Sequence, residues 1–103
     1  MNADHVRNYF LSCPEAIEDF PFGNEVHVFK IKEKMFGFLA YRDGVARVNL
    51  KCDPDEAIML RSRFESVIPG YHMNKTHWNT LVLDGTVPND EIEVMIENSY
   101  DLV

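Results

Sequence analysis

Residues 35–51 read MFGFLAYRDGVARVNLK, and this stretch decides the fold. Two runs rich in β-branched and aromatic residues, 35–41 and 45–51, lie on either side of Asp43-Gly44, a pair that favours a tight turn between antiparallel strands. A third run of the same kind, 25–31, precedes them in the chain. The pattern therefore predicts a three-stranded antiparallel meander.

Helical patterns flank the meander. At the N-terminal side, apolar residues spaced i, i+3, i+4 and i+7 predict a helix over 3–12, followed by a turn-rich passage over 14–24. After the meander, Asp53 provides an N-cap and Pro54 occupies the first helical position. These signals predict a second helix that runs to about Arg63.

The last third of the chain completes the predicted order α-β-β-β-α-β-β-α. Short apolar runs predict strands at 71–73 and 78–83, and a final helix is expected to be capped at Asn89 or its neighbour. Short connections imply an α+β fold with two layers: a five-stranded, mostly antiparallel sheet and helices on one face. A chain of 103 residues is long enough for one compact core, so a single domain over 1–103 is expected. The predicted core residues are Val6, Phe10, Val48, Leu50, Leu60, Leu81, Leu83, Ile92 and Ile96.

Cysteine usage and hydropathy indicate the compartment. Cys13 and Cys52 stand alone, without the closely spaced partner that a zinc half-site needs. Two isolated cysteines in a chain without a secretory segment suggest reduced thiols and a cytoplasmic protein. No window approaches 18 consecutive apolar residues, so no membrane association is expected.

The formal net charge of −7 argues against a strong general nucleic-acid binder. The charge is unevenly distributed, because residues 30–75 hold nine basic side chains against six acidic ones, a local charge of +3. Both flanking segments are acidic. Any affinity for DNA is therefore expected to be weak or to depend on a partner.

Alternation in the run 45–51 creates the first candidate site. Successive side chains of a strand point to opposite faces, so Arg47, Asn49 and Lys51 project together, away from the helix-covered face. Two interpretations are open. The stripe is either an ordinary solvated face or an anion-binding surface, in which Arg47 offers a bidentate fork and Lys51 a point charge.

The stretch HMNKTHWN at 72–79 is the most chemically loaded in the chain. If its strand neighbours the first candidate site, its basic and amide side chains extend that surface, and Trp78 can stack on a ring. The structural alternative makes Trp78 a core anchor and Asn74 a turn residue. The predicted binding residues are Arg47, Asn49, Lys51, Lys75, His77 and Asn79.

No metal, cofactor or catalytic motif stands out. His72 and His77 lie five residues apart, and no paired-ligand spacing for zinc is present. The sequence contains no GxSxG, P-loop or GxGxxG pattern. We therefore expect a non-catalytic protein without a cofactor.

Several stretches resemble the MmcQ/YjbR family of small bacterial proteins, whose role is largely unassigned. The most specific are HMNKTHWN at 72–79 and LDGTVP at 83–88, supported by FPFG at 20–23 and VFKI at 28–31. The resemblance implies a two-layer fold similar to bacterial secretion chaperones. It also implies a double-wing DNA-binding arrangement in which two β-hairpins contact the duplex. The wing contacts would then be Lys32, Lys34 and Arg42.

Three hypotheses for function follow. The first is a non-catalytic module that binds DNA through the open sheet face and the two hairpins. The second is a protein-interaction or chaperone-like adaptor, in which the open sheet accepts a peptide, a protein partner or a second copy of the chain as a homodimer. The third is a sensor of a small anionic ligand, or an enzyme, built around residues 72–79.

Overall fold

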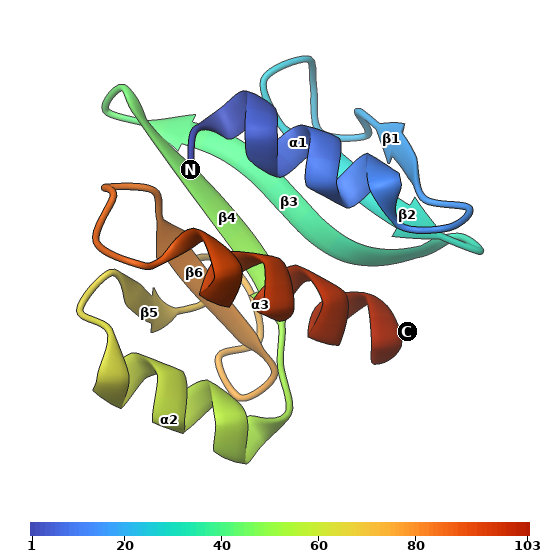
Figure 1. Cartoon of the computed structure of the whole chain (residues 1–103). Helices are drawn as coiled ribbons and strands as arrows, with labels where there is room; N and C mark the ends of the chain where they lie inside the picture. Colours follow the sequence, from blue (N-terminus) through green and yellow to red (C-terminus); the bar gives the residue numbers. More distant parts are fainter.

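The computed structural model describes all residues from 1 to 103. The elements in chain order are α1 (Ala3–Ser12), β1 (Ile17–Asp19), β2 (His27–Ile31), β3 (Lys34–Arg42), β4 (Val45–Lys51), α2 (Pro54–Arg63), β5 (Val67–Pro69), β6 (Trp78–Val82) and α3 (Asn89–Asp101). The strands form one antiparallel sheet in the order β1-β2-β3-β4-β6-β5 (Figure 1). The predicted α+β fold is confirmed, with six strands in place of the five expected.

The predicted hairpin at Asp43-Gly44 joins β3 to β4. Both residues have positive φ angles, 53° and 79°, the turn geometry that matches the twist of two antiparallel strands. A second turn of the same kind joins β2 to β3 at Lys32 and Glu33, with φ angles of 49° and 67°. Neither residue is glycine, so pairing of the flanking strands must hold this less favourable backbone in place.

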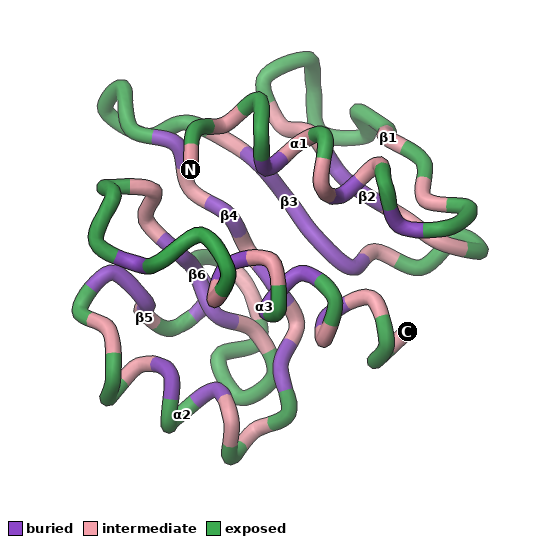
Figure 2. The backbone as a smooth tube through the Cα atoms, in the orientation of Figure 1, coloured by how far each residue is buried: buried purple, intermediate pink, exposed green.

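The three helices cover one face of the sheet. α1 lies over β3, α3 packs against β3 and β4, and α2 lies beside β5 and β6 (Figure 1). Beneath them Ala46, Val48 and Leu50 of β4 are buried, as the alternation predicts. The ring of Phe10 in α1 stacks on Phe29 of β2, with 4.2 Å between the ring centroids. Figure 2 shows that buried residues gather in the central strands and in the inward turns of the helices.

Gly37 of β3 allows α1 to approach the sheet closely. A Cβ atom at this position would lie 2.1 Å from the Phe10 ring, far inside van der Waals contact. The register between β2 and β3 shifts at this point, and Phe36 also faces the helices, with its ring 5.6 Å from that of Phe10. The irregularity thus adds a second aromatic side chain to the core.

Two segments differ from the sequence-based expectation. Residues 71–73, predicted as a strand, form a turn in which His72 has a positive φ of 57°. The strand at this place is β5, which precedes Gly70, and its Pro69 is tolerated because β5 is an edge strand. Residues 14–24, predicted as turns, contain the three-residue strand β1 at the other edge.

Eight of the nine predicted core residues are buried. The exception is Leu83, which lies beyond the end of β6 and is half-buried against the edge of the core. None of the three helices combines the length and the apolar character that crossing a membrane demands.

Candidate ligand pocket on the open sheet face

Loops partly cover the sheet face opposite the helices. Two loops border it, residues 20–26 before β2 and residues 70–77 between β5 and β6, and a cavity of about 630 Å³ lies between them and the strands. We call this cavity the sheet-face pocket. Eight of its thirteen lining residues are hydrophobic. Its volume falls within the range of roughly 300–1,000 Å³ that is typical of small-molecule sites.

The floor of the sheet-face pocket comes from three adjacent strands. Phe38 of β3 pairs with Asn49 of β4, which pairs in turn with Thr80 of β6, and Ala40 pairs with Arg47. Paired residues share one face of a sheet, so these five side chains lie together on the side away from the helices. The predicted projection of Arg47 and Asn49 from the open face is therefore confirmed.

Aromatic side chains form the walls. The ring of Phe22 lies 6.3 Å from that of Phe38, and Tyr71 borders the pocket from the loop after β5. Arg42, at the end of β3, lies over the Tyr71 ring with its Cζ atom 4.5 Å from the centroid, a cation–π contact. The pocket thus has an apolar interior and a cation at its rim.

Arg47 is the unusual member of the floor. Its side chain is half-buried, its Nε atom is buried without a hydrogen-bond partner, and it takes part in none of the five ion pairs of the protein. A buried donor that has lost water without gaining a partner costs about 1–3 kcal/mol, and more when it is charged. The unpartnered Nε atom therefore leaves Arg47 with unused hydrogen-bonding capacity on the floor of the pocket.

Hydrogen bonds on the floor orient the neighbouring amide. The Tyr71 N–H donates to Thr80 Oγ1 at 3.0 Å, which leaves the Thr80 hydroxyl free to donate to Asn49 Oδ1. Because the Asn49 oxygen accepts this bond, its NH₂ group remains available as a donor. The same chain of bonds ties the Tyr71 wall to the floor.

Three further predicted binding residues lie outside the pocket. Lys75 donates through Nζ to the carbonyl of Gly70 at 3.0 Å, so its ammonium group holds the loop together. His77 is exposed on the same loop and does not line the cavity. Lys51 pairs with Trp78 at the end of β4, beyond the pocket.

Asn79 lies on the opposite face of the sheet, so its predicted place on the shared surface is wrong. It pairs with Leu50, whose side chain is buried among the core residues. Its Nδ2 atom donates to the carbonyl of Ala57 in α2 at 3.2 Å. The register between β4 and β6 therefore turns this amide toward the helices.

Asn74 follows the structural alternative, whereas Trp78 does not, because it pairs with Lys51 on the open face and is not part of the hydrophobic core. The Trp78 ring lies 5.6 Å from that of Phe38, and a Cβ atom at Gly70 would lie 2.8 Å from the Trp78 Cβ. Asn74 Oδ1 accepts the N–H of Thr76 at 2.9 Å, as expected of a turn residue. The HMNKTHWN motif therefore builds and anchors the loop that forms one wall of the pocket.

The two predicted wings lie at opposite ends of β3 (Figure 1). Lys32 and Lys34 are exposed around one hairpin, whereas Arg42 stands next to the other. The nine residues of β3 separate these positions by roughly 25 Å along the strand. The basic side chains therefore do not form one continuous patch.

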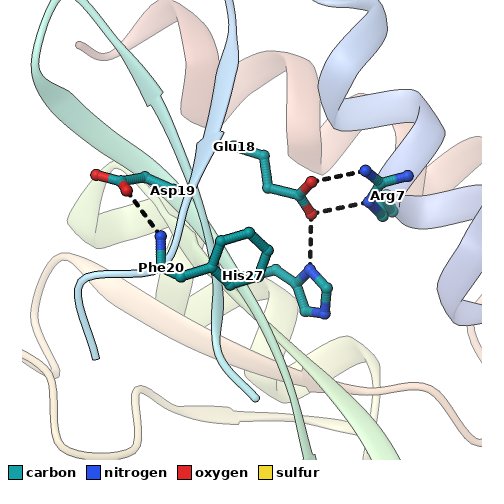
Figure 3. Close-up of polar contacts among 5 residues, drawn as sticks. All are labelled: Arg7, Glu18, Asp19, Phe20 and His27. Carbon is teal, nitrogen blue, oxygen red and sulfur yellow. Dashed lines mark hydrogen bonds and ion pairs between the residues drawn. The ribbon is translucent and has the colours of Figure 1, made fainter. Parts of the chain in front are cut away.

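A second polar cluster, missed in the sequence, holds the edge strand β1 in place (Figure 3). Glu18 accepts hydrogen bonds from Nε and Nη2 of Arg7 in α1, at 2.8 and 2.6 Å, and from Nδ1 of His27 in β2, at 2.6 Å. The bonds from Arg7, followed by the bond from His27, hold the pKa of Glu18 below its usual value. Both Glu18 oxygens have partners, so the cluster acts as a clamp between three elements.

The LDGTVP motif also has a structural explanation. Asp84 accepts hydrogen bonds from the Ser66 hydroxyl, and from the N–H and hydroxyl of Thr86 at 3.0 and 2.6 Å. These bonds, that of Ser66 first, lower the pKa of Asp84 to about 2. The motif thus locks the turn between β6 and α3. No group of three or more His, Cys, Asp or Glu side chains is arranged to hold a metal ion.

Comparison with known proteins places this fold among bacterial relatives. The YjbR family model matches residues 11–102. The uncharacterized protein YbdF of Escherichia coli O157:H7 is 37% identical over 84 residues, which cover 82% of this chain and 69% of YbdF. The uncharacterized protein YjbR of E. coli K12 is 28% identical over 97% of this chain and 85% of its own length. The crystal structure of Deinococcus radiodurans DR2400 matches 97% of this chain and 76% of its own, with a TM-score of 0.89 and 39% identity.

Proposed function

The chain belongs to the YjbR family, and we propose that it is a non-catalytic binding module that receives an anionic ligand in the sheet-face pocket. The observation that carries the proposal is the buried, unpartnered Nε of Arg47 on the floor of that pocket. A small movement of the Arg47 side chain would bring this covered atom to the cavity, where a carboxylate or phosphate oxygen would supply the missing charge-assisted hydrogen bond.

The lining supports binding rather than catalysis. The sheet-face pocket contains no carboxylate, thiol or lysine, and the hydroxyl of Thr80 is committed to Asn49. Both cysteines are buried elsewhere, and burial raises the pKa of the Cys52 thiol to about 11. His72 is the only imidazole in the lining, and no hydrogen bond joins it to a hydroxyl there, which is the pairing that covalent catalysis uses.

Arginine Nε–H resonances offer a direct test, because the buried Nε–H of Arg47 is itself the proposed contact. The protein is titrated with sodium acetate and with sodium phosphate, and sodium chloride at matched ionic strength serves as the reference. We expect the Arg47 resonance to move and approach saturation with at least one of the two anions. The Arg63 resonance provides an internal control, since that guanidinium pairs with Glu91 on the helix side. An Arg47 resonance that responds to both anions no more than to chloride would remove the proposal.

Duplex DNA is a second candidate, favoured by the exposure of Lys32 and Lys34 at one hairpin without an ion-pair partner. The net charge of −7 and the wide separation of the two wings oppose strong binding. Labelled duplex is titrated at two salt concentrations with the wild type and the double variant Lys32→Ala/Lys34→Ala. Phosphate contacts by both lysines predict a salt slope that falls by about two in the double variant. An unchanged slope would exclude this wing from DNA binding.

A peptide-binding adaptor receives less support from the geometry. Addition of a peptide strand requires a free sheet edge, and the edges here are β1 and β5. Each edge strand is only three residues long, so it offers few backbone groups to a partner.

A further inference from the structure

Resting on the proposed function, we propose that the ligand of the sheet-face pocket is an aromatic carboxylic acid. Its single carboxylate would bind Arg47 and Asn49 on the floor, and its flat apolar ring would lie among Phe22, Phe38 and Tyr71. Four observations support this class of ligand: the number of free cationic groups, the geometry of the floor donors, the character of the walls and the prior order of one wall.

The pocket has a place for one anionic group. Arg47 is the only lining side chain with a buried, unpartnered cationic donor. The other lining arginine, Arg42, is held over the ring of Tyr71 at the rim. Polyphosphates and nucleic-acid backbones carry several charges and require a lining rich in cations. Eight hydrophobic lining residues and two arginines, one of them at the rim, fit a monoanion with an apolar body better.

The donors on the floor suit a carboxylate. A guanidinium presents Nε–H and an Nη–H side by side, which matches the two oxygens of a carboxylate. Arg47 and Asn49 are two positions apart on β4, so their side chains project from the same face at neighbouring places. The bond from Thr80 leaves the Asn49 NH₂ group free to donate to the remaining lone pairs of the same carboxylate.

The walls suit a ring. Phe22 and Phe38 face each other at 6.3 Å between centroids, and Tyr71 stands across the pocket from the other loop. Aromatic rings prefer offset-stacked and edge-to-face neighbours, so three rings provide several such contacts for a flat ligand. Met35 and Met73 line the same space with flexible thioethers, which adapt to the outline of an apolar body.

One wall is already ordered before any ligand arrives. The backbone of Tyr71 is tied to Thr80 at 3.0 Å, and its ring is held by Arg42. The wall formed by Phe22 is more open, because this residue is 63% exposed. A partly preorganised pocket loses less conformational entropy on binding, which favours a small rigid ligand. Phe22 then closes over the ring from the solvent side.

Isothermal titration calorimetry with the wild-type protein tests the class of ligand without any substitution. The probes are benzoate, 1-naphthoate, 1-naphthylmethanol and acetate. The tighter of the two aromatic acids should bind at least tenfold more strongly than both the neutral alcohol and acetate. Only the acid has both a carboxylate for the floor donors and a ring for the aromatic walls. Equal affinity for the acid and the alcohol would overturn the role of Arg47, and equal affinity for the acid and acetate would overturn the role of the walls.

Two matched pairs of variants locate the binding site. Arg47→Gln should reduce the affinity for the aromatic acid to that for the alcohol, whereas Arg63→Gln on α2 should leave it unchanged. Phe22→Ala should weaken the aromatic acid severalfold and leave acetate unaffected. Phe20→Ala is its control, because the Phe20 ring packs against His27 at 5.0 Å and does not line the pocket. Equal effects within either pair would overturn the assignment.

The anion site and the aromatic ligand are tested separately by these experiments. If acetate moves the Arg47 Nε–H resonance but the aromatic acids bind no tighter than acetate, the aromatic ligand is wrong and the anion site stands. If no anion, aromatic or simple, moves that resonance, the proposed function is wrong as well.

Discussion

Two buried polar side-chain atoms lack a hydrogen-bond partner, and they lie on opposite faces of the sheet. On the helix face, the Oδ1 atom of Asn79 is a neutral acceptor, enclosed beneath α2 in a residue that is 4% exposed. On the open face, the Nε atom of Arg47 belongs to a cation and lies at the floor of a cavity of about 630 Å³. The first deficit is a fixed cost to stability. In the proposed function, the second is satisfied by the ligand.

The rest of each face follows the same division. On the helix face, Ser99 accepts the N–H of Lys51 and donates to the carbonyl of Phe36, so a buried hydroxyl seals the packing between α3 and the sheet. On the open face, aromatic loop residues surround space instead of filling it. Substitutions on the helix face should therefore change stability, and those on the open face should mainly change binding.

The largest expected effect lies in the helix-face core. Ile96 of α3 is fully buried, so Ile96→Ala should lower the free energy of unfolding by about 2–5 kcal/mol. Val94 on the same helix is 50% exposed, and Val94→Ala is the control that should change it by less than about 0.5 kcal/mol. Urea denaturation measures both. A loss below about 1 kcal/mol for Ile96→Ala would mean that this face is less tightly packed than described.

Substitution of two glycines, Gly37 and Gly70, allows the two faces to be compared directly. At Gly37 an added Cβ would lie 2.1 Å from the Phe10 ring, and at Gly70 it would lie 2.8 Å from the Trp78 Cβ. Each substitution to alanine should cost about 1–3 kcal/mol through overpacking. Gly37→Ala should leave ligand affinity unchanged in the fraction that is folded, whereas Gly70→Ala should also weaken binding by displacing the Tyr71 wall. Urea denaturation measures the loss of stability, and calorimetry measures the change in ligand affinity. Identical ligand affinity of the two variants would contradict the division between the faces.

The Glu18 clamp predicts a pH dependence of stability. Hydrogen bonds from Arg7 and His27 lower the pKa of Glu18 from its ordinary value of 4.5, so the folded state favours the ionised form. The resulting stabilisation is complete above pH 4.5 and is lost as the pH falls through the lowered pKa. At neutral pH, Glu18→Gln should cost about 1 kcal/mol, a modest value because 42% of the Arg7 side-chain surface is exposed to water.

Urea midpoints measured from neutral to acidic pH provide the test. The wild type should lose more stability than Glu18→Gln as the medium becomes acidic, so the difference between the two should shrink. Glu65→Gln, at an exposed position without a hydrogen-bond partner, is the matched control for loss of one negative charge. A constant difference between wild type and Glu18→Gln at all pH values would show that the clamp contributes no proton linkage.

Local signals predicted the parts of the fold that depend on neighbouring residues. Residues 45–51 form β4 with the expected bounds, because a tight turn and strict alternation specify that strand by themselves. β1 escaped detection because it has only three residues and is held by contacts of Glu18 with Arg7 of α1 and His27 of β2, which a pattern within the strand cannot show. The strand predicted at 71–73 lies instead at 67–69, on the other side of Gly70.

The candidate site was also predicted only where the pattern of a single strand was sufficient. Arg47 and Asn49 were placed correctly because both lie on one strand with a clear core face. Asn79 was assigned to the wrong face although Leu81, two residues later on the same strand, was predicted in the core, and alternation places both side chains on one face. The walls of the sheet-face pocket come from two loops that are distant in the sequence. No local sequence pattern predicts that Phe22 and Tyr71 border the same cavity.

The smallest expected effect distinguishes the two roles open to Arg42. As part of the pocket, its guanidinium lies 4.5 Å from the centroid of the Tyr71 ring, a contact worth about 0.5–1 kcal/mol at an exposed site. Arg42→Ala should then weaken the aromatic acid by roughly two- to fivefold and leave DNA binding unchanged. As a wing contact, Arg42 would bind a phosphate, and its loss would lower the salt slope of DNA binding by about one without affecting the acid. Titration of both ligands against this single variant therefore decides whether the end of β3 belongs to the pocket or to a wing.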